Sequence, residues 1–150
     1  LAGVPISQFL DMKDCGAVLF AHQPLGDKSD WYGFSKISIE ENSKSLLTEV
    51  HVDNVVPFKN RFGKDVQLIA LIAEKDYLEI NIRERATETE EIVKVRLNVA
   101  ITEVEKIRKL QEQGLIDHII TVNKDNRAKL AQIVIDLTSE IFSKQEYGKI

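Results

Sequence analysis

The stretch from residue 65 to residue 101 constrains the fold of this chain more than any other. It contains three successive apolar-rich segments, DVQLIALIAE, YLEINIRER and EIVKVRLNVAI, which are joined by short polar turns. In the second and third segments apolar and polar residues alternate, which is the period of a half-buried strand. The sequence therefore predicts an antiparallel three-strand meander over residues 65–101.

The three predicted strands of the meander differ in whether one or both of their faces are apolar. The first is apolar on both faces between Leu68 and Ile72, which predicts a central strand that is covered on both sides. In the other two strands the alternation limits the register, because a slip by one residue would place charges in the apolar row. The preferred register sets Glu79 opposite Arg96 as a favourable cross-strand pair.

The N-terminal part of the chain contains further strand patterns. Residues 5–12 allow one or two helical turns, and the apolar run at 16–22 predicts a buried strand. Alternation predicts strands at 31–40, where the glycine marks a bulge or a close contact, and at 46–53. Residues 54–64 contain a proline and a glycine and are expected to form a long irregular segment.

The period changes to a helical one after the predicted meander. Thr102 and Glu105 have the spacing of a capping box, which predicts a helix over about 102–113. Residues 116–122 allow a helix, but β-branched residues and the preceding glycine favour a strand that follows a crossover helix. Residues 124–143 give the clearest helix, with a broad apolar stripe.

These elements predict one α+β domain over residues 1–150. A mostly antiparallel sheet, made of the meander at 65–101 and the N-terminal strands, is expected to pack against the C-terminal helices. A chain of 150 residues is long enough to bury a core without disulfides, and its single cysteine allows no internal disulfide. We expect a protein of the cytoplasm or a virion component.

Composition excludes several classes of partner. The net charge is −4 and no basic stripe is present, so a nucleic-acid partner is not expected. No apolar run reaches the roughly 18 residues that a membrane span needs, and the N-terminus does not resemble a signal peptide. The chain contains neither GxxxxGK nor GxGxxG, and no cofactor is predicted.

One row of side chains has the types that bind metals. Glu49, His51 and Asp53 alternate along the predicted strand at 46–53, so they would share one face. Such a row suits Zn²⁺ or Mn²⁺, with His22 or His118 as a remote ligand, and would support a metal-dependent hydrolase. The simpler interpretation is the polar face of a half-buried strand.

Aromatic and arginine side chains give the favoured functional hypothesis. Such residues anchor protein interfaces, although core packing is the alternative interpretation of the aromatic ones. The candidates are Trp31, Tyr32, Phe58, Arg61 and Phe62. They predict a non-enzymatic interaction or assembly module that binds a protein partner or forms a homo-oligomer. The remaining alternative is a small-molecule sensor with a pocket between sheet and helix. The sequence identifies neither the partner nor the process.

Overall fold

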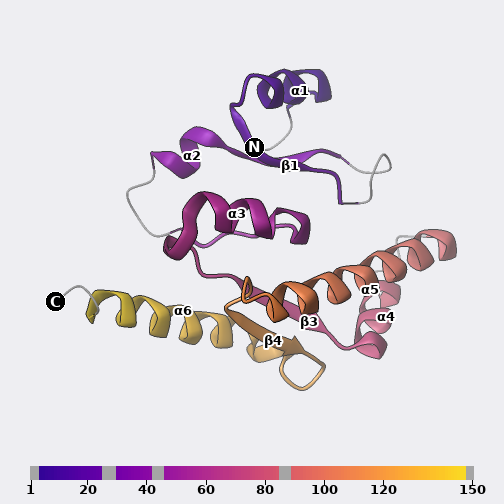
Figure 1. Ribbon diagram of the computed structural model, residues 1–150. Coiled ribbons are helices and arrows are strands. Elements are labelled where there is room, and N and C mark those ends of the chain that lie inside the picture. The colour runs from indigo at the N-terminus through magenta and orange to yellow at the C-terminus, as the bar shows by residue number, and fades with distance from the viewer. Residues whose placement is uncertain (1–3, 25–29, 42–45, 85–88, 148–150) are drawn as a thin grey trace. The chain divides into compact units, whose positions relative to one another are not determined.

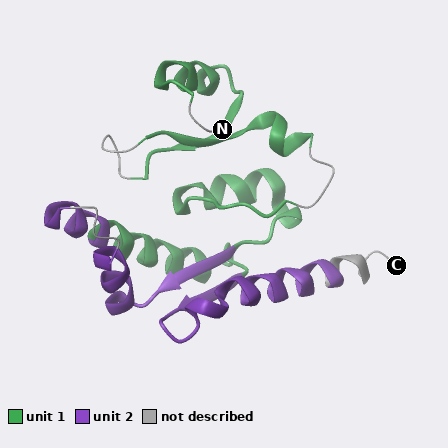
Figure 2. Ribbon diagram, turned by 180° about the vertical axis from the view of Figure 1, so that it is seen from behind, with its two compact units in different colours: residues 1–68, 98–117 green, residues 69–97, 118–150 purple. Residues whose placement is uncertain are grey.

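The computed structural model describes residues 4–24, 30–41, 46–84 and 89–147 (Figure 1). The chain divides into two compact units (Figure 2). Unit 1 consists of residues 1–68 and 98–117, and unit 2 consists of residues 69–97 and 118–150. The predicted mixture of helices and strands is confirmed, and a single domain stays a prediction. In the described part of the chain, no helix combines the length and apolar character needed to cross a bilayer.

Unit 1 contains a small antiparallel sheet and several short helices. Its elements are α1 (Ile6–Asp14), β1 (Val18–His22), β2 (Tyr32–Ser35), α2 (Lys36–Glu40), η2 (Val52–Asn54), α3 (Val55–Phe62), η3 (Gly63–Asp65) and the C-terminal part of α5 (Glu90–Glu112). In the sheet, Val18 of β1 lies opposite Ser35 of β2. The helix predicted at 5–12 and the strand predicted at 16–22 are confirmed.

An aromatic cluster ties β1, β2 and α3 together. Phe58 of α3 is 4% exposed, and its ring stacks on Phe20 of β1 with centroids 3.9 Å apart. Phe34 of β2 and Phe62 of α3 approach the Phe58 ring at 5.5 Å and 5.6 Å. Because aromatic rings bury large apolar surfaces, this cluster stabilises the contact of the sheet with α3.

Gly33 lets β2 approach its neighbours closely. A Cβ atom at this position would lie 2.4 Å from Cγ1 of Val18, and 3.3 Å from both the Leu19 carbonyl oxygen and Phe9 Cζ. Val18 and Phe9 are themselves buried, so they have little room to move. The expectation that this glycine marks a close contact is confirmed.

Unit 2 is built on two parallel strands. Its elements are β3 (Ile69–Ala73), α4 (Lys75–Glu84), the N-terminal part of α5, β4 (His118–Val122), η4 (Arg127–Lys129) and α6 (Leu130–Tyr147). Ile69 of β3 lies opposite His118 of β4, and the pairing continues in parallel to the ends of both strands. The strand predicted at 116–122 and the helix predicted at 124–143 are confirmed.

Only the first strand of the predicted meander is confirmed as a strand, and it is not the central, doubly covered strand that was expected. β3 belongs to a two-stranded sheet, and its Leu71 is 49% exposed. The segments expected as the second and third strands of the meander lie in α4 and α5, and the sheet of unit 2 is parallel rather than antiparallel. Glu79 is not part of a hairpin. Its carboxylate accepts a hydrogen bond from Arg83 Nε at 3.0 Å within the same helix. Helical spacing explains this pair, because residues four apart lie on the same side of a helix.

Three other expectations are corrected. The predicted strand at 46–53 is absent, because residues 46–51 have no regular structure and η2 follows. The predicted strand at 31–40 ends at Ser35, which caps α2. Residues 55–62 form α3 instead of an irregular segment, since the proline at its third position is compatible with a first helical turn.

The helix predicted to begin at Thr102 begins instead at Glu90. Thr102 lies inside α5, where its hydroxyl donates to the Asn98 carbonyl at 3.0 Å. The spacing of a capping box therefore misled the prediction, because a threonine inside a helix bonds back to the preceding turn.

Arg83 connects α4 to the first turn of α5. Its two terminal nitrogens donate to the two carboxylate oxygens of Glu90 at 2.6 Å and 2.9 Å. The hydrogen bond from Arg83 lowers the pKa of Glu90 below its usual range. A lowered carboxyl pKa stabilises the fold above the unfolded-state pKa, and this contribution is lost as the pH falls through the folded-state pKa.

Candidate functional site

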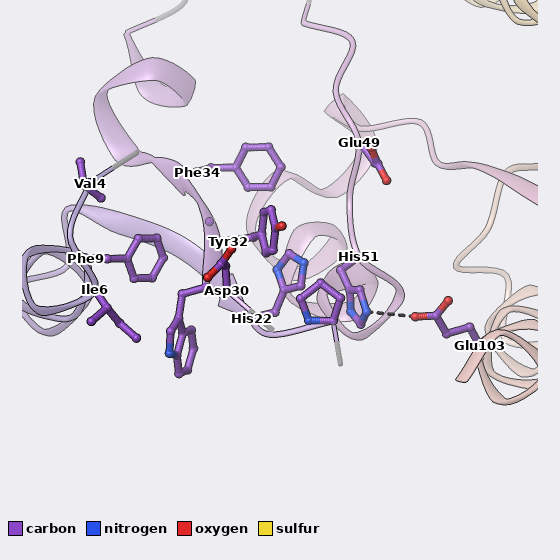
Figure 3. Close-up of a pocket in the computed structure, with 13 residues that line it drawn as sticks. Val4, Ile6, Phe9, His22, Asp30, Tyr32, Phe34, Glu49, His51 and Glu103 are labelled. Carbon is purple, nitrogen blue, oxygen red and sulfur yellow. Dashed lines mark ion pairs between the residues drawn. The ribbon is translucent and has the colours of Figure 1, made fainter. Parts of the chain in front are cut away.

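Unit 1 contains a pocket of about 910 Å³. One part of its lining is apolar and contains Val4, Ile6, Phe9 and Trp31. The other part is polar and contains His22, Asp30, Glu49, His51 and Glu103. Figure 3 shows Val4, Ile6 and Phe9 on one side of the pocket, and Glu49, His51 and Glu103 on the other. A ligand with one apolar and one polar side would match this division.

Conjugated rings gather in the polar part of the pocket. The imidazoles of His22 and His51 are stacked, with centroids 4.5 Å apart and planes inclined by 26°. The Tyr32 ring follows at 6.0 Å from His22 with an inclination of 30°. The three rings come from β1, β2 and the residue before η2. This arrangement gives a planar ligand a surface on which to stack.

The position of His51 at the start of η2 determines which of its ring nitrogens accepts a hydrogen bond. The backbone N–H of Asp53 donates to His51 Nδ1 at 3.3 Å. A neutral His51 therefore carries its proton on Nε2. This nitrogen lies 3.1 Å from Glu103 Oε1 but is buried without an aligned hydrogen-bond partner among the residues that the structure describes (Figure 3).

His22 follows a strained segment of β1. Phe20 has a φ of 56°, and the register of the β1–β2 pair is irregular between Leu19 and His22. This backbone conformation costs a non-glycine residue roughly 1–3 kcal/mol. The side chain of Asn54, which is 7% exposed, supports the segment by donating to the Phe20 carbonyl at 2.8 Å. Asn54 Nδ2 also lies 3.2 Å from Nδ1 of His22.

The pocket is acidic. Asp30 and Glu49 are exposed, and neither forms a hydrogen bond or ion pair with another described residue. No lysine or arginine occurs among the described lining residues. The lining therefore offers several hydrogen-bond acceptors and favours a ligand portion that is neutral or positively charged and carries N–H donors.

The residues predicted as metal ligands are only partly brought together. Glu49 and His51 both line the pocket, and His51 Nδ1 lies 3.7 Å from Asp53 Oδ2, but Asp53 also accepts a hydrogen bond from Lys106 at 2.6 Å. Within the described ranges, no three histidine, cysteine, aspartate or glutamate residues are placed to hold a metal ion. The segment is not the extended strand on which the prediction depended, and metal binding by these residues stays a prediction.

The residues predicted to form an interaction surface have different environments. Trp31 lines the pocket and packs against Phe9, and Tyr32 lines the pocket with 52% of its surface exposed. Phe58 and Phe62 belong to the aromatic cluster, and Arg61 forms an ion pair with Glu40. Trp31 and Tyr32 therefore both belong to the pocket, whereas Phe58 lies in the core.

Sequence reasoning missed Asn54 and Glu103. The sequence predicts a loop position for Asn54 and a position on the charged surface of a helix for Glu103. No local pattern marks either residue, because each acquires its role through a histidine that is distant in sequence. The one available signal was His22, a polar residue that closes an otherwise apolar segment.

Comparison with known proteins gives one partial similarity. No family model matches the chain. A guanylate kinase from Fusobacterium nucleatum subsp. nucleatum is 33% identical over 79 residues, which cover 51% of this chain and 43% of that protein. The chain thus spans less than half the length of this curated relative.

Proposed function

We propose that the pocket of unit 1 binds guanylate, and that the chain supplies the guanylate-binding part of a kinase of the guanylate kinase type. The observation that carries the proposal is the stack of His22 and His51 beside the carboxylates of a pocket of about 910 Å³. The partial similarity to a guanylate kinase supports the choice of ligand.

The lining matches the chemistry of a guanine base. A base stacked on an aromatic ring gains about 1–3 kcal/mol. The pairing edge of guanine carries the N1–H and the N2 amino group, and one carboxylate can accept hydrogen bonds from both. Glu49 is the candidate, because Glu103 lies against His51 whereas Glu49 is unpaired among the described residues. Adenine has an acceptor at N1, so a carboxylate disfavours it.

The acidic lining also determines how the ligand is oriented. A phosphate group would be repelled by Asp30, Glu49 and Glu103, and the described lining has no lysine or arginine to offset them. The proposal therefore places the base inside the pocket and the phosphate at its open side.

Replacing the glutamate tests this proposal. Glu49→Gln is expected to weaken GMP binding by roughly 10- to 100-fold, because hydrogen bonds to a charged acceptor contribute about 1.5–3 kcal/mol. Isothermal titration calorimetry with GMP and AMP measures the effect. The unmodified chain should prefer GMP, and the substitution should remove most of that preference.

The exposed Glu41, which follows α2, offers a matched control. Glu41→Gln makes the same chemical change outside the pocket and should bind GMP like the unmodified chain. Equal affinity of the unmodified chain for GMP and AMP, or no binding of either nucleotide, would contradict the proposal.

A second candidate is the non-enzymatic interaction or assembly module. Several large apolar side chains are exposed in unit 1, among them Tyr32 (52%), Ile37 (64%), Leu46 (51%) and Leu47 (67%). Exposed apolar groups of this kind favour association of two copies of the chain.

For this second candidate, native mass spectrometry at micromolar concentration should detect a dimer. Leu47→Asp should restore the monomer, because it replaces the most exposed of these apolar side chains with a charged one. A monomer at every concentration of the unmodified chain would rule out self-association.

A further inference from the structure

We infer that Asn54 is a positioning residue that holds His22 in the neutral tautomer with its proton on Nε2. In this form the ring, which lines the pocket, carries its N–H donor on Nε2. The inference about the tautomer stands on hydrogen-bond geometry alone. Its consequence for the ligand rests on the proposed function.

The Phe20 carbonyl fixes the orientation of the Asn54 amide. A carbonyl oxygen can only accept, so the amide atom that lies 2.8 Å from it must be the nitrogen. The opposite orientation would place two acceptor oxygens in contact. The position of the Asn54 NH₂ group is thus determined by a backbone group whose polarity cannot change.

The amide in turn fixes the tautomer of His22. The same Asn54 nitrogen lies 3.2 Å from His22 Nδ1, and an NH₂ group has a second hydrogen to donate. With this hydrogen directed at the ring, Nδ1 is the acceptor, and the proton of the neutral ring lies on Nε2. The competing arrangement is a proton on Nδ1 that donates to the Phe20 oxygen at 3.3 Å, a contact longer than either Asn54 contact.

The position of Asn54 suits a fixed support. The residue is 7% exposed and joins η2 to α3, so its backbone is held by two helical segments. Its side chain makes no capping bond to α3. The amide is therefore available to Phe20 and His22.

The two stacked imidazoles then have the same tautomer, with the proton on Nε2. His51 accepts at Nδ1 from the Asp53 backbone and carries its proton on Nε2, like His22. His22 then offers an N–H donor at Nε2, whereas His51 Nε2 is buried beside Glu103, and the exposed carboxylates of the pocket offer acceptors. Guanine matches both, because its major-groove edge presents N7 and O6 as acceptors and its pairing edge presents donors.

Nitrogen-15 NMR of the histidine rings tests the tautomer directly, at a pH where the rings are neutral. In the unmodified chain, His22 Nδ1 should give a pyridine-type signal and Nε2 a pyrrole-type signal. A pyrrole-type Nδ1 in the unmodified chain would overturn the inference.

Asn54→Asp provides the second arm of the test. A carboxylate cannot donate to His22, so a proton should move onto Nδ1 and its signal should become pyrrole-type. Aspartate is favourable at the start of a helix, so α3 should persist. Asn60→Asp is the matched control, since Asn60 is exposed on α3 and should leave the His22 signals unchanged. An Nδ1 signal that stays pyridine-type in Asn54→Asp would show that another group sets the tautomer.

GMP titration of the same proteins separates this inference from the proposed function. If guanylate binds through the His22 N–H, Asn54→Asp should lower the affinity for GMP by about fivefold or more, because one hydrogen bond is lost. A switched tautomer without GMP binding by any of the proteins would support the role of Asn54 and contradict guanylate as the ligand.

Discussion

Replacing Phe58 with alanine is expected to lower the free energy of unfolding of unit 1 by about 3–5 kcal/mol. The ring is 4% exposed and contacts the rings of Phe20, Phe34 and Phe62. Its removal would leave a cavity between α3 and the sheet. The stacked contact with Phe20 would also be lost, and Phe20 has the strained backbone on which the orientation of His22 depends.

Denaturant unfolding monitored by fluorescence would measure this loss, because the single tryptophan, Trp31, lies in unit 1. Phe142→Ala, a substitution in unit 2, serves as the control for the loss of a phenylalanine ring outside unit 1. Phe142 is 42% exposed on α6, and its removal should change stability by about 0.5 kcal/mol or less. Equal midpoints for Phe58→Ala and the unmodified chain would show that the aromatic cluster does not stabilise unit 1.

Asp117→Ala is expected to cost unit 1 about 2–3 kcal/mol. One oxygen of this carboxylate accepts from Lys59 Nζ and from the Leu68 backbone N–H, both at 2.7 Å. The two side chains are only 15% and 23% exposed. The substitution would therefore leave a half-buried ammonium group and a backbone donor without their acceptor, and the remaining bond from Lys59 to the Val66 carbonyl would not compensate.

A second ion pair of unit 1 provides the comparison. Asp53 and Lys106 are separated by 2.6 Å, but their side chains are 55% and 46% exposed. Solvent screening should limit the effect of Asp53→Ala to less than about 1 kcal/mol. The same fluorescence-detected unfolding curves test both variants. If Asp53→Ala proved the more destabilising of the two, burial would not be the factor that separates these pairs.

The strands wrongly predicted at 76–101 show that one segment can contain both the two-residue period of a strand and the period of a helix. Val93, Val95, Leu97, Val99 and Ile101 alternate, which is why a strand was predicted. The residues that are least exposed along α5 instead follow a helical stripe, which contains Val93, Leu97, Ala100, Val104 and Ile107. The segment is also rich in glutamate, lysine and arginine, which are good helix formers. Composition outweighed the alternation.

Elements with a single dominant period were predicted well. The apolar run of β1, the β-branched segment of β4 and the broad stripe of α6 were all identified from the sequence. The pairing of β3 with β4 could not be predicted, because both helices between them had been assigned partly or wholly to strands.

The candidate site was less accessible to prediction than the fold. His51 and Glu49 were selected as polar residues of a strand face, and Tyr32 as an aromatic anchor. Their gathering around one pocket depends on Glu103 from α5, Asn54 before α3 and the irregularity in β1. These are contacts between distant segments, and they have no periodic signature in the sequence.

The discontinuity of unit 1 has a consequence for synthesis on the ribosome. Residues 98–117, which supply Glu103, Lys106 and Asp117, are translated after β3 and α4. A nascent chain of 1–68 therefore lacks the carboxylate for Lys59 and the glutamate beside His51. Because folding proceeds during translation, unit 1 can complete its contacts only after residue 117 has left the exit tunnel.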